Sequence, residues 1–393
     1  MLTKQQELEN EVWDLDRCAG CGMCVAACSR GRLEFKSEAQ HPTFIPKVKT
    51  VGLSVVDIDT CSFCEGMCTE SCPRLKEWEE KEIIDVISAK TTRNITSNHV
   101  NEIIIDLLSA GFMNGYIDAA LIMDVNRWDG IPYSKVVRSI EELYEVSGNQ
   151  KLWNPILSNL YQEALKNNFS QIAIVGPPCV AQAIKRVTES DIEGLSILRK
   201  SIGIMIGLFC SGYYESALLE DLSSHLDVSP AEIISITSSF KGKYLEIKLT
   251  TGKSAKFPLE EEQKYLRKGC ARCTDYLANA ADISIGQTGS QIGYTSLIAW
   301  NPKGHSFLNN CINLELIEIT EEVDFKAISA ACSEKHRRER TQTFDSLLIY
   351  SLETLMDENR LLEAKNRFLG LFTQKKNEGT LKIQGDCNGC SNC

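Results

Sequence analysis

The chain has 393 residues, of which 43% are hydrophobic and 24% are charged, and its net charge is −11. This length allows two or three domains with cores of their own, and the acidic charge argues against nucleic acid as the main partner. No apolar stretch is long enough to span a bilayer and the polar N-terminus does not look like a targeting peptide, so we expect a cytoplasmic protein.

Two cysteine runs lie within the first 75 residues. They are Cys18-Ala-Gly-Cys21-Gly-Met-Cys24-Val-Ala-Ala-Cys28 and Cys61-Ser-Phe-Cys64-Glu-Gly-Met-Cys68-Thr-Glu-Ser-Cys72. The first has the C-x2-C-x2-C-x3-C spacing of bacterial ferredoxins, in which three close cysteines hold one [4Fe-4S] cluster and the fourth ligates the other cluster. We therefore predict two clusters, ligated by Cys18, Cys21, Cys24 and Cys72 and by Cys28, Cys61, Cys64 and Cys68. A pair of zinc knuckles or a disulfide framework fits eight cysteines in two quartets less well.

The two runs depart from the ferredoxin pattern at two points. Ser29 follows Cys28, where proline is usual, and three residues rather than two separate Cys64 from Cys68. Gly66 lies inside this longer spacing. We predict that it takes a positive φ, which an extra residue in a tight ligand loop demands.

Beyond the cysteine runs, strand and helix patterns alternate. Residues 75–84 form a predicted charged helix, and further helices are expected at 101–110, 139–146, 154–166 and from Pro177 onward. Buried strands are expected at 117–123, 171–176, 202–209, 282–286 and 295–300, and antiparallel strands at 233–239, 243–249 and 253–258. The alternation predicts an α/β fold. We expect a bacterial-ferredoxin-like domain at 1–80, an α/β flavin and iron–sulfur domain at 81–320, and a helical extension with a cysteine-rich tail at 321–393.

Four more cysteines lie beside predicted strands: Cys179, Cys210 and the pair Cys270 and Cys273. The carboxyl ends of strands in an open α/β sheet are where ligands bind. From spacing alone, the Cys270/Cys273 pair indicates a metal site, whereas Cys179 and Cys210 are more typical of buried core thiols.

The segment from Cys270-Ala-Arg-Cys273-Thr-Asp to Ala281-Asp-Ile-Ser-Ile-Gly286-Gln-Thr-Gly289 resembles the signature of the coenzyme F420 hydrogenase/dehydrogenase β-subunit family. Gly176-Pro-Pro-Cys179 and Gly207-Leu-Phe-Cys210 match two further elements of that family. With its N-terminal clusters, the chain looks most similar to the input subunits of archaeal F420H2 dehydrogenases.

The resemblance implies a third [4Fe-4S] cluster, ligated by Cys179, Cys210, Cys270 and Cys273, beside an FAD. It also implies that Gly286, Gly289 and Gly293 let the backbone approach the cofactor. Reduced coenzyme F420 would supply a hydride, and electrons would pass to a redox partner protein or a multisubunit oxidoreductase complex, with peripheral association with a membrane complex left open. Residues 93–100 lack the Gly-Gly element of the family, so the alternative is a non-enzymatic electron-transfer subunit without a working flavin site.

Two other segments carry groups of functional side chains. Cys387, Cys390 and Cys393 form a CxxCxxC that either holds a metal or is a tail of free thiols. Lys335-His-Arg-Arg-Glu-Arg340 is a basic run that we expect to be solvated, with a docking face as the alternative. Cys311 and Cys332 are expected to be core residues.

Overall fold

The computed structural model describes residues 3–36, 39–46, 48–51, 54–57, 61, 64–76, 81–93, 99–146, 151–239, 244–258, 263–320 and 322–355. The chain divides into two compact units, Met1–Glu339 and Arg340–Cys393. The described part of the second unit is the end of helix α13 (Phe325–Leu355). The tail cysteines Cys387, Cys390 and Cys393 lie outside the described residues. The predicted boundaries at residues 80 and 320 stay predictions.

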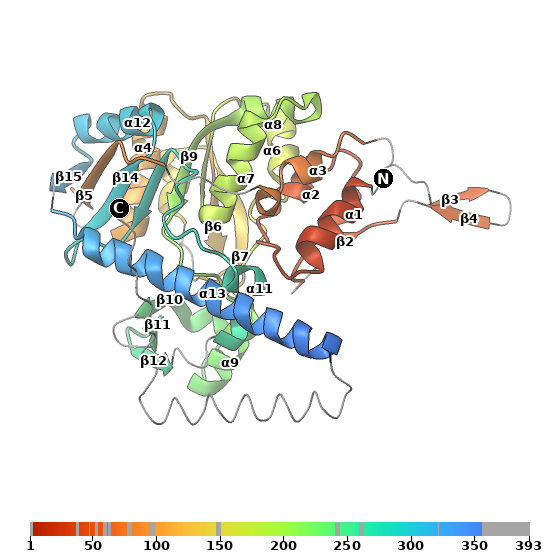
Figure 1. Cartoon of the computed structure of the whole chain (residues 1–393). Coiled ribbons are helices and arrows are strands. Elements are labelled where there is room, and N and C mark those ends of the chain that lie inside the picture. Colours follow the sequence, from red (N-terminus) through yellow and green to blue (C-terminus); the bar gives the residue numbers. More distant parts are fainter. Residues whose placement is uncertain are drawn as a thin grey trace, which may run out of the picture. The chain divides into compact units, whose positions relative to one another are not determined.

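An eight-stranded mixed sheet forms the centre of the first unit (Figure 1), in the order β15-β5-β14-β13-β9-β8-β6-β7. The strands are β5 Asp85–Thr91, β6 Ala119–Val125, β7 Pro132–Val137, β8 Ile172–Gly176, β9 Ile202–Leu208, β13 Ile283–Gly286, β14 Thr295–Ala299 and β15 Ile317–Thr320. The four inner strands β6, β8, β9 and β13 run parallel. Every residue of β8 is buried, as expected for a strand covered on both faces.

Helices cover both faces of this sheet. On one face, α4 (His99–Met113) and α12 (Pro302–Asn313) pack through Leu107 and Phe307 onto the strands. On the other face, α6 (Leu160–Asn167), α7 (Pro178–Glu189) and α8 (Ser196–Ser201) form a second apolar core. The α/β fold class is therefore confirmed. Cys311 is buried in the first core, as predicted, whereas Cys332 of α13 is only half-buried.

A three-stranded antiparallel sheet follows the parallel strands in the chain. It consists of β10 Ile233–Ser239, β11 Tyr244–Leu249 and β12 Ser254–Pro258, which confirms the three predicted antiparallel strands. The remaining short helices of the unit after β5 are α5 Ile140–Tyr144, α9 Ala217–Leu226 and α11 Lys268–Ala271. Helical turns lie at η3 Glu193–Leu195, η4 Pro230–Glu232 and η5 Gln263–Tyr265. No helix among the described residues is long and apolar enough to cross a membrane.

The N-terminal segment folds around short helices. Its elements are α1 Lys4–Leu8, η1 Glu9–Trp13, α2 Met23–Ala27, β1 Leu33–Glu34, β2 Thr43–Phe44, β3 Val48–Val51, β4 Ser54–Asp57, α3 Met67–Glu70 and η2 Pro73–Leu75. Met23 and Met67, one from each of α2 and α3, are buried in the same core as α6, α7 and α8. The N-terminal segment therefore shares a core with the α/β domain instead of standing apart.

One helix prediction is wrong. A charged helix is predicted at 75–84, but the helical turn η2 ends at Leu75 and residues 81–84 are not helical. Residues 77–80 lie outside the described part of the chain. Strand β5 begins immediately afterwards and pairs on both sides, with β14 and β15. Because those strands come from more than 200 residues further along the chain, pairing of distant segments decides the local structure here.

Candidate functional site: three cysteine quartets around adjoining cavities

The first quartet, Cys18, Cys21, Cys24 and Cys72, surrounds a cavity of about 330 Å³. The loop before α2 carries Cys18 and Cys21, α2 itself carries Cys24, and Cys72 follows α3. Burial and the neighbouring thiols Cys18, Cys21 and Cys72 raise the pKa of Cys24 well above its ordinary value. The structure thus groups the four residues that the ferredoxin spacing predicts.

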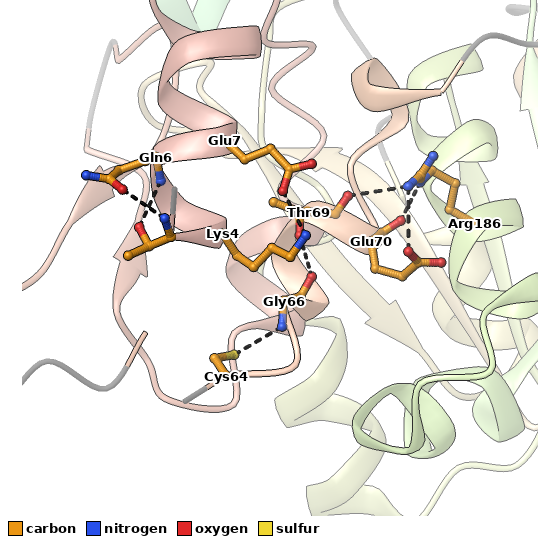
Figure 2. Close-up of polar contacts among 9 residues, drawn as sticks. Lys4, Gln6, Glu7, Cys64, Gly66, Thr69, Glu70 and Arg186 are labelled. Carbon is orange, nitrogen blue, oxygen red and sulfur yellow. Dashed lines mark hydrogen bonds and ion pairs between the residues drawn. The ribbon is translucent and has the colours of Figure 1, made fainter. Parts of the chain in front are cut away.

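The second quartet lies around a separate cavity of about 450 Å³, which is lined by Cys28, Cys61, Cys64 and Cys68. Burial, followed by the effect of Cys28, Cys64 and Cys61, raises the pKa of Cys68 to about 12. Gly66 has a φ of +77°, which confirms the predicted positive φ. Its N–H group points to the Cys64 sulfur at 3.5 Å, as Figure 2 shows, so the extra residue also places a donor beside a predicted ligand.

Helix α3, which carries Cys68, is tied to the α/β domain by Arg186 of α7. The Arg186 guanidinium donates to the backbone carbonyls of Glu70 and Thr69, the latter at 3.4 Å (Figure 2). Lys4 and Glu7 form an ion pair of 3.0 Å within α1. The two Arg186 contacts tie α3, and with it Cys68, to α7.

The third quartet combines residues that are far apart in the sequence. Cys179 lies in the first turn of α7, Cys210 follows β9, and Cys270 and Cys273 lie in and just after α11. All four line one cavity of about 490 Å³. The ends of β8 and β9 deliver Cys179 and Cys210 to the same edge of the parallel sheet, where ligands bind in folds of this kind.

Two cations, Arg74 and Lys335, also line the third cavity. Burial alone would raise the pKa of Cys273, but Lys335 and Arg74 lower it to about 7. Burial by itself would likewise lower the pKa of Lys335, yet the thiolates of Cys273 and Cys210 raise it. The two cations thus favour the thiolate form of Cys273, which is the form that ligates a metal.

Sequence reasoning missed both cations. Lys335 belongs to the basic run that was expected to be solvated, but it is only 4% exposed, so that prediction is wrong for this residue. Arg74 follows Cys72 and Pro73, and nothing in its spacing distinguishes it from a surface arginine. Only the fold places these two side chains beside the third quartet.

The first and third cavities share a wall. Ala19, Gly20, Cys21 and Arg74 line both of them. The shared loop is anchored to the α/β domain, because Leu157 donates to the Cys21 carbonyl (3.0 Å) and the Trp153 indole to that of Gly20 (2.9 Å). On the other side of the contact, Gly269 of α11 lies directly against the Cys18 backbone. Two predicted cluster loops are thus in van der Waals contact.

A fourth cavity, of about 550 Å³, lies at the carboxyl ends of β6, β8 and β9. Its walls are mainly aliphatic and include Ile105 and Leu108 of α4 and Leu208 of β9. It shares Met123, Pro177 and Tyr213 with the third cavity. Apolar pockets with a few polar groups are typical sites for small molecules and cofactors.

The structure does not bring the three predicted cofactor glycines, Gly286, Gly289 and Gly293, into these four cavities. A side chain at Gly286 would overlap the ring of Phe209, and one at Gly289 would meet Ile328 of α13. Gly289 and Gly293 both have positive φ angles. Packing and turn geometry therefore account for Gly286 and Gly289, and a cofactor role for the loop stays a prediction.

The donor sets fit the predicted clusters. Each quartet offers four thiols around one cavity, whereas no three His, Cys, Asp or Glu side chains of the described residues meet as the ligands of a single metal ion do. A cubane bound by four thiolates is anionic, and net charge is one of the features that tune such a cluster. At the third quartet, Arg74 and Lys335 supply compensating positive charge.

Comparison with known proteins agrees with this arrangement. Residues 169–324 match the C-terminal region of the coenzyme F420 hydrogenase/dehydrogenase beta-subunit family, and residues 17–75 match the 4Fe-4S dicluster domain. The first match contains all four cysteines of the third quartet, and the second contains all eight of the other two.

Among relatives, an uncharacterised protein of Methanocaldococcus jannaschii is 28% identical over 86% of this chain and 98% of its own length. A subunit of the F420H2 dehydrogenase of Methanosarcina mazei is 27% identical, over 76% of this chain and 83% of its own. The coenzyme F420-dependent sulfite reductase of M. jannaschii is 27% identical over 81% of this chain, which spans 50% of that enzyme.

A solved structure, the xenon-derivatised F420-reducing [NiFe] hydrogenase complex from Methanosarcina barkeri, contains a chain of similar fold. Its TM-score is 0.61 at 20% identity, over 67% of this chain and 92% of that one. This likeness shows a shared fold. The family matches and the F420-linked relatives agree with the resemblance seen in the cysteine motifs: residues 169–324 are similar to the C-terminal region of coenzyme F420 hydrogenase/dehydrogenase β subunits, and they follow a segment that matches the 4Fe-4S dicluster domain.

Proposed function

We propose that this protein is an iron–sulfur flavoprotein subunit that passes electrons from a hydride donor, reduced coenzyme F420 or a similar compound, to a partner protein. A flavin accepts two electrons as a hydride and releases them one at a time, which suits transfer to [4Fe-4S] clusters. The chain's own residues would hold these groups at fixed distances and exclude water between them.

The order of the cavities is the observation that carries this proposal. The apolar cavity adjoins the third quartet through Met123, Pro177 and Tyr213. The third quartet adjoins the first through the loop of Ala19 to Cys21 and through Arg74. The first and second cavities share Leu8. Four redox groups in these cavities would form a single row.

Cysteine exposure increases from the first quartet to the second, which stands at one end of this row. Cys21, Cys24 and Cys72 of the first quartet are buried, whereas all four cysteines of the second quartet are half-buried. The second quartet is therefore where we expect a partner protein to receive electrons. The aliphatic walls of the apolar cavity, at the other end, would hold the ring system of the flavin, and Tyr213 lies between that cavity and the third quartet.

A second candidate function has its own support. The glycines that the resemblance assigns to the cofactor, Gly286, Gly289 and Gly293, do not line the apolar cavity. On the same scaffold, the protein would then be an electron-transfer subunit that connects a partner oxidoreductase to another acceptor. The two candidates differ in flavin content and in the ability to oxidise reduced coenzyme F420.

Filling the apolar cavity tests the first candidate. Ile105→Trp places an indole among the aliphatic walls, and we expect flavin per chain to fall at least tenfold and oxidation of reduced coenzyme F420 to stop, with the iron content unchanged. Met113→Trp is the matched control, because Met113 lies on the same helix and is 58% exposed. If the Ile105→Trp protein keeps its flavin and its oxidation rate, the flavin does not bind in this cavity.

A further inference from the structure

Helix α13 begins at Phe325, immediately after the region that matches the β-subunit family, residues 169–324. Its first half nevertheless reaches the third quartet. Ile328 lies against the backbone of Gly289, and Arg338 donates to the Cys270 carbonyl at 3.1 Å. A segment outside the matched region thus forms one wall of the third site.

Lys335 is the residue of α13 that enters the third cavity. Its ammonium donates to the carbonyl of Cys210 at 2.7 Å and to that of Asp275 at 2.5 Å. Two of its three N–H donors are thereby directed at backbone oxygens that flank the cysteines. These bonds hold the positive charge at one position beside the quartet.

A buried ammonium is costly unless negative charge lies nearby. Cys210 and Cys273, two of the proposed ligands of the third cluster, line the same cavity as the Lys335 ammonium. The Asp275 carboxylate is a further negative group nearby, and its Oδ1 accepts from the Ala278 N–H (2.9 Å) and its Oδ2 from the Gln182 amide (2.8 Å). An anionic cluster held by this quartet would therefore add negative charge beside Lys335.

We propose that Lys335 sets the reduction potential of the third [4Fe-4S] cluster and makes it higher than it would otherwise be. A fixed positive charge stabilises the reduced cluster, which carries one more negative charge than the oxidised one, and burial keeps this interaction strong. This inference rests on the third cluster of the proposed function. It makes Lys335 a positioning residue for electron transfer, supplied by the helix that follows the matched region.

The test is a potentiometric titration of the intact, anaerobically purified protein, followed by electron paramagnetic resonance. The third cluster is identified as the signal that Cys273→Ala abolishes. For Lys335→Met we expect the reduction equilibrium constant of this signal to fall at least tenfold, which corresponds to about 59 mV for one electron. For Lys335→Arg, which keeps the charge, we expect a change of less than threefold.

Arg337→Gln is the matched control. It removes one positive charge two residues away, but the Arg337 side chain is 70% exposed and paired with Glu334, so solvent screens it. The proposal is overturned if Lys335→Met leaves the third potential within threefold of the wild type, or if Arg337→Gln shifts it equally. If the wild-type protein shows no signal that Cys273→Ala abolishes, the third cluster itself is refuted. Failure of the proposed function and failure of the role of Lys335 therefore give different results.

Loss of the third cluster from the neutral variant is also informative. If Lys335→Met and Lys335→Gln both lack about four irons while Lys335→Arg retains them, the charge is needed to hold the cluster, which supports its electrostatic role. If Lys335→Arg loses the cluster as well, the residue acts through packing and the proposal is wrong.

Discussion

Replacing Cys273 by alanine is expected to remove about four of about twelve iron atoms per chain and to leave the two N-terminal clusters in place. Cys273 is 6% exposed, and its two neighbouring cations lower its thiol pKa to about 7 in spite of burial. Its loss removes a proposed ligand from the cavity that Lys335 and Arg74 also line. Iron analysis and electron paramagnetic resonance of the reduced protein measure the result.

Cys311→Ala is the control for this change. Cys311 lies on α12, is completely buried in the core on that face of the sheet, and lines none of the three cysteine cavities. The same substitution there should therefore leave the iron content unchanged. Electron transfer gives a second result: a strong chemical reductant should still reduce the N-terminal clusters of the Cys273→Ala protein, but reduced coenzyme F420 should not. Full iron in Cys273→Ala, or equal loss in both variants, would show that Cys273 is not a ligand.

The second large effect is expected at Gly269, where α11 touches the loop of the first quartet. A β-carbon there would overlap the Cys18 carbonyl oxygen and lie 2.6 Å from its carbonyl carbon. Since both neighbours are backbone, Gly269→Ala must push α11 and the Cys18 loop apart, at a cost of about 1–3 kcal/mol. The wider gap between the first and third quartets should slow electron transfer between them at least tenfold.

Gly252→Ala separates this effect from general destabilisation. Gly252 has a φ of +79° and no neighbour within 4 Å, so alanine there strains the backbone of a turn by about 1–2 kcal/mol without touching a quartet. Stopped-flow reduction under anaerobic conditions, followed by rapid freezing for electron paramagnetic resonance, measures the transfer step in both variants. Unchanged transfer in Gly269→Ala would mean that the Cys18–Gly269 contact does not lie on the electron path.

Much of this arrangement could be predicted from the sequence, because it depends on short-range patterns. The ferredoxin spacing groups eight cysteines into the two sets that line the first and second cavities. The extra residue beside Gly66 predicts its positive φ, which is +77°. Apolar runs predict β8, β9 and β10 within one residue at either end. The third quartet required the family resemblance, since spacing alone gave Cys179 and Cys210 no role.

What could not be predicted depends on tertiary structure. Lys335 and Arg74 look like surface charges in the sequence. Only the fold buries Lys335 and places both side chains in the cavity that Cys273 lines. Strand β5 was missed because its neighbours β14 and β15 lie more than 200 residues away. The predicted cofactor glycines belong to a sequence motif of the family. The motif does not show that Gly286 packs against Phe209 and Gly289 against Ile328, because both contacts depend on the fold.

The most direct test of the whole account is the iron and flavin content of one anaerobically purified sample of the full chain. Three quartets and one apolar cavity predict about twelve irons per chain, together with about one FAD. About twelve irons without flavin, even after FAD is supplied, would favour the electron-transfer subunit. About eight irons would contradict the account, because the third quartet would then hold no cluster.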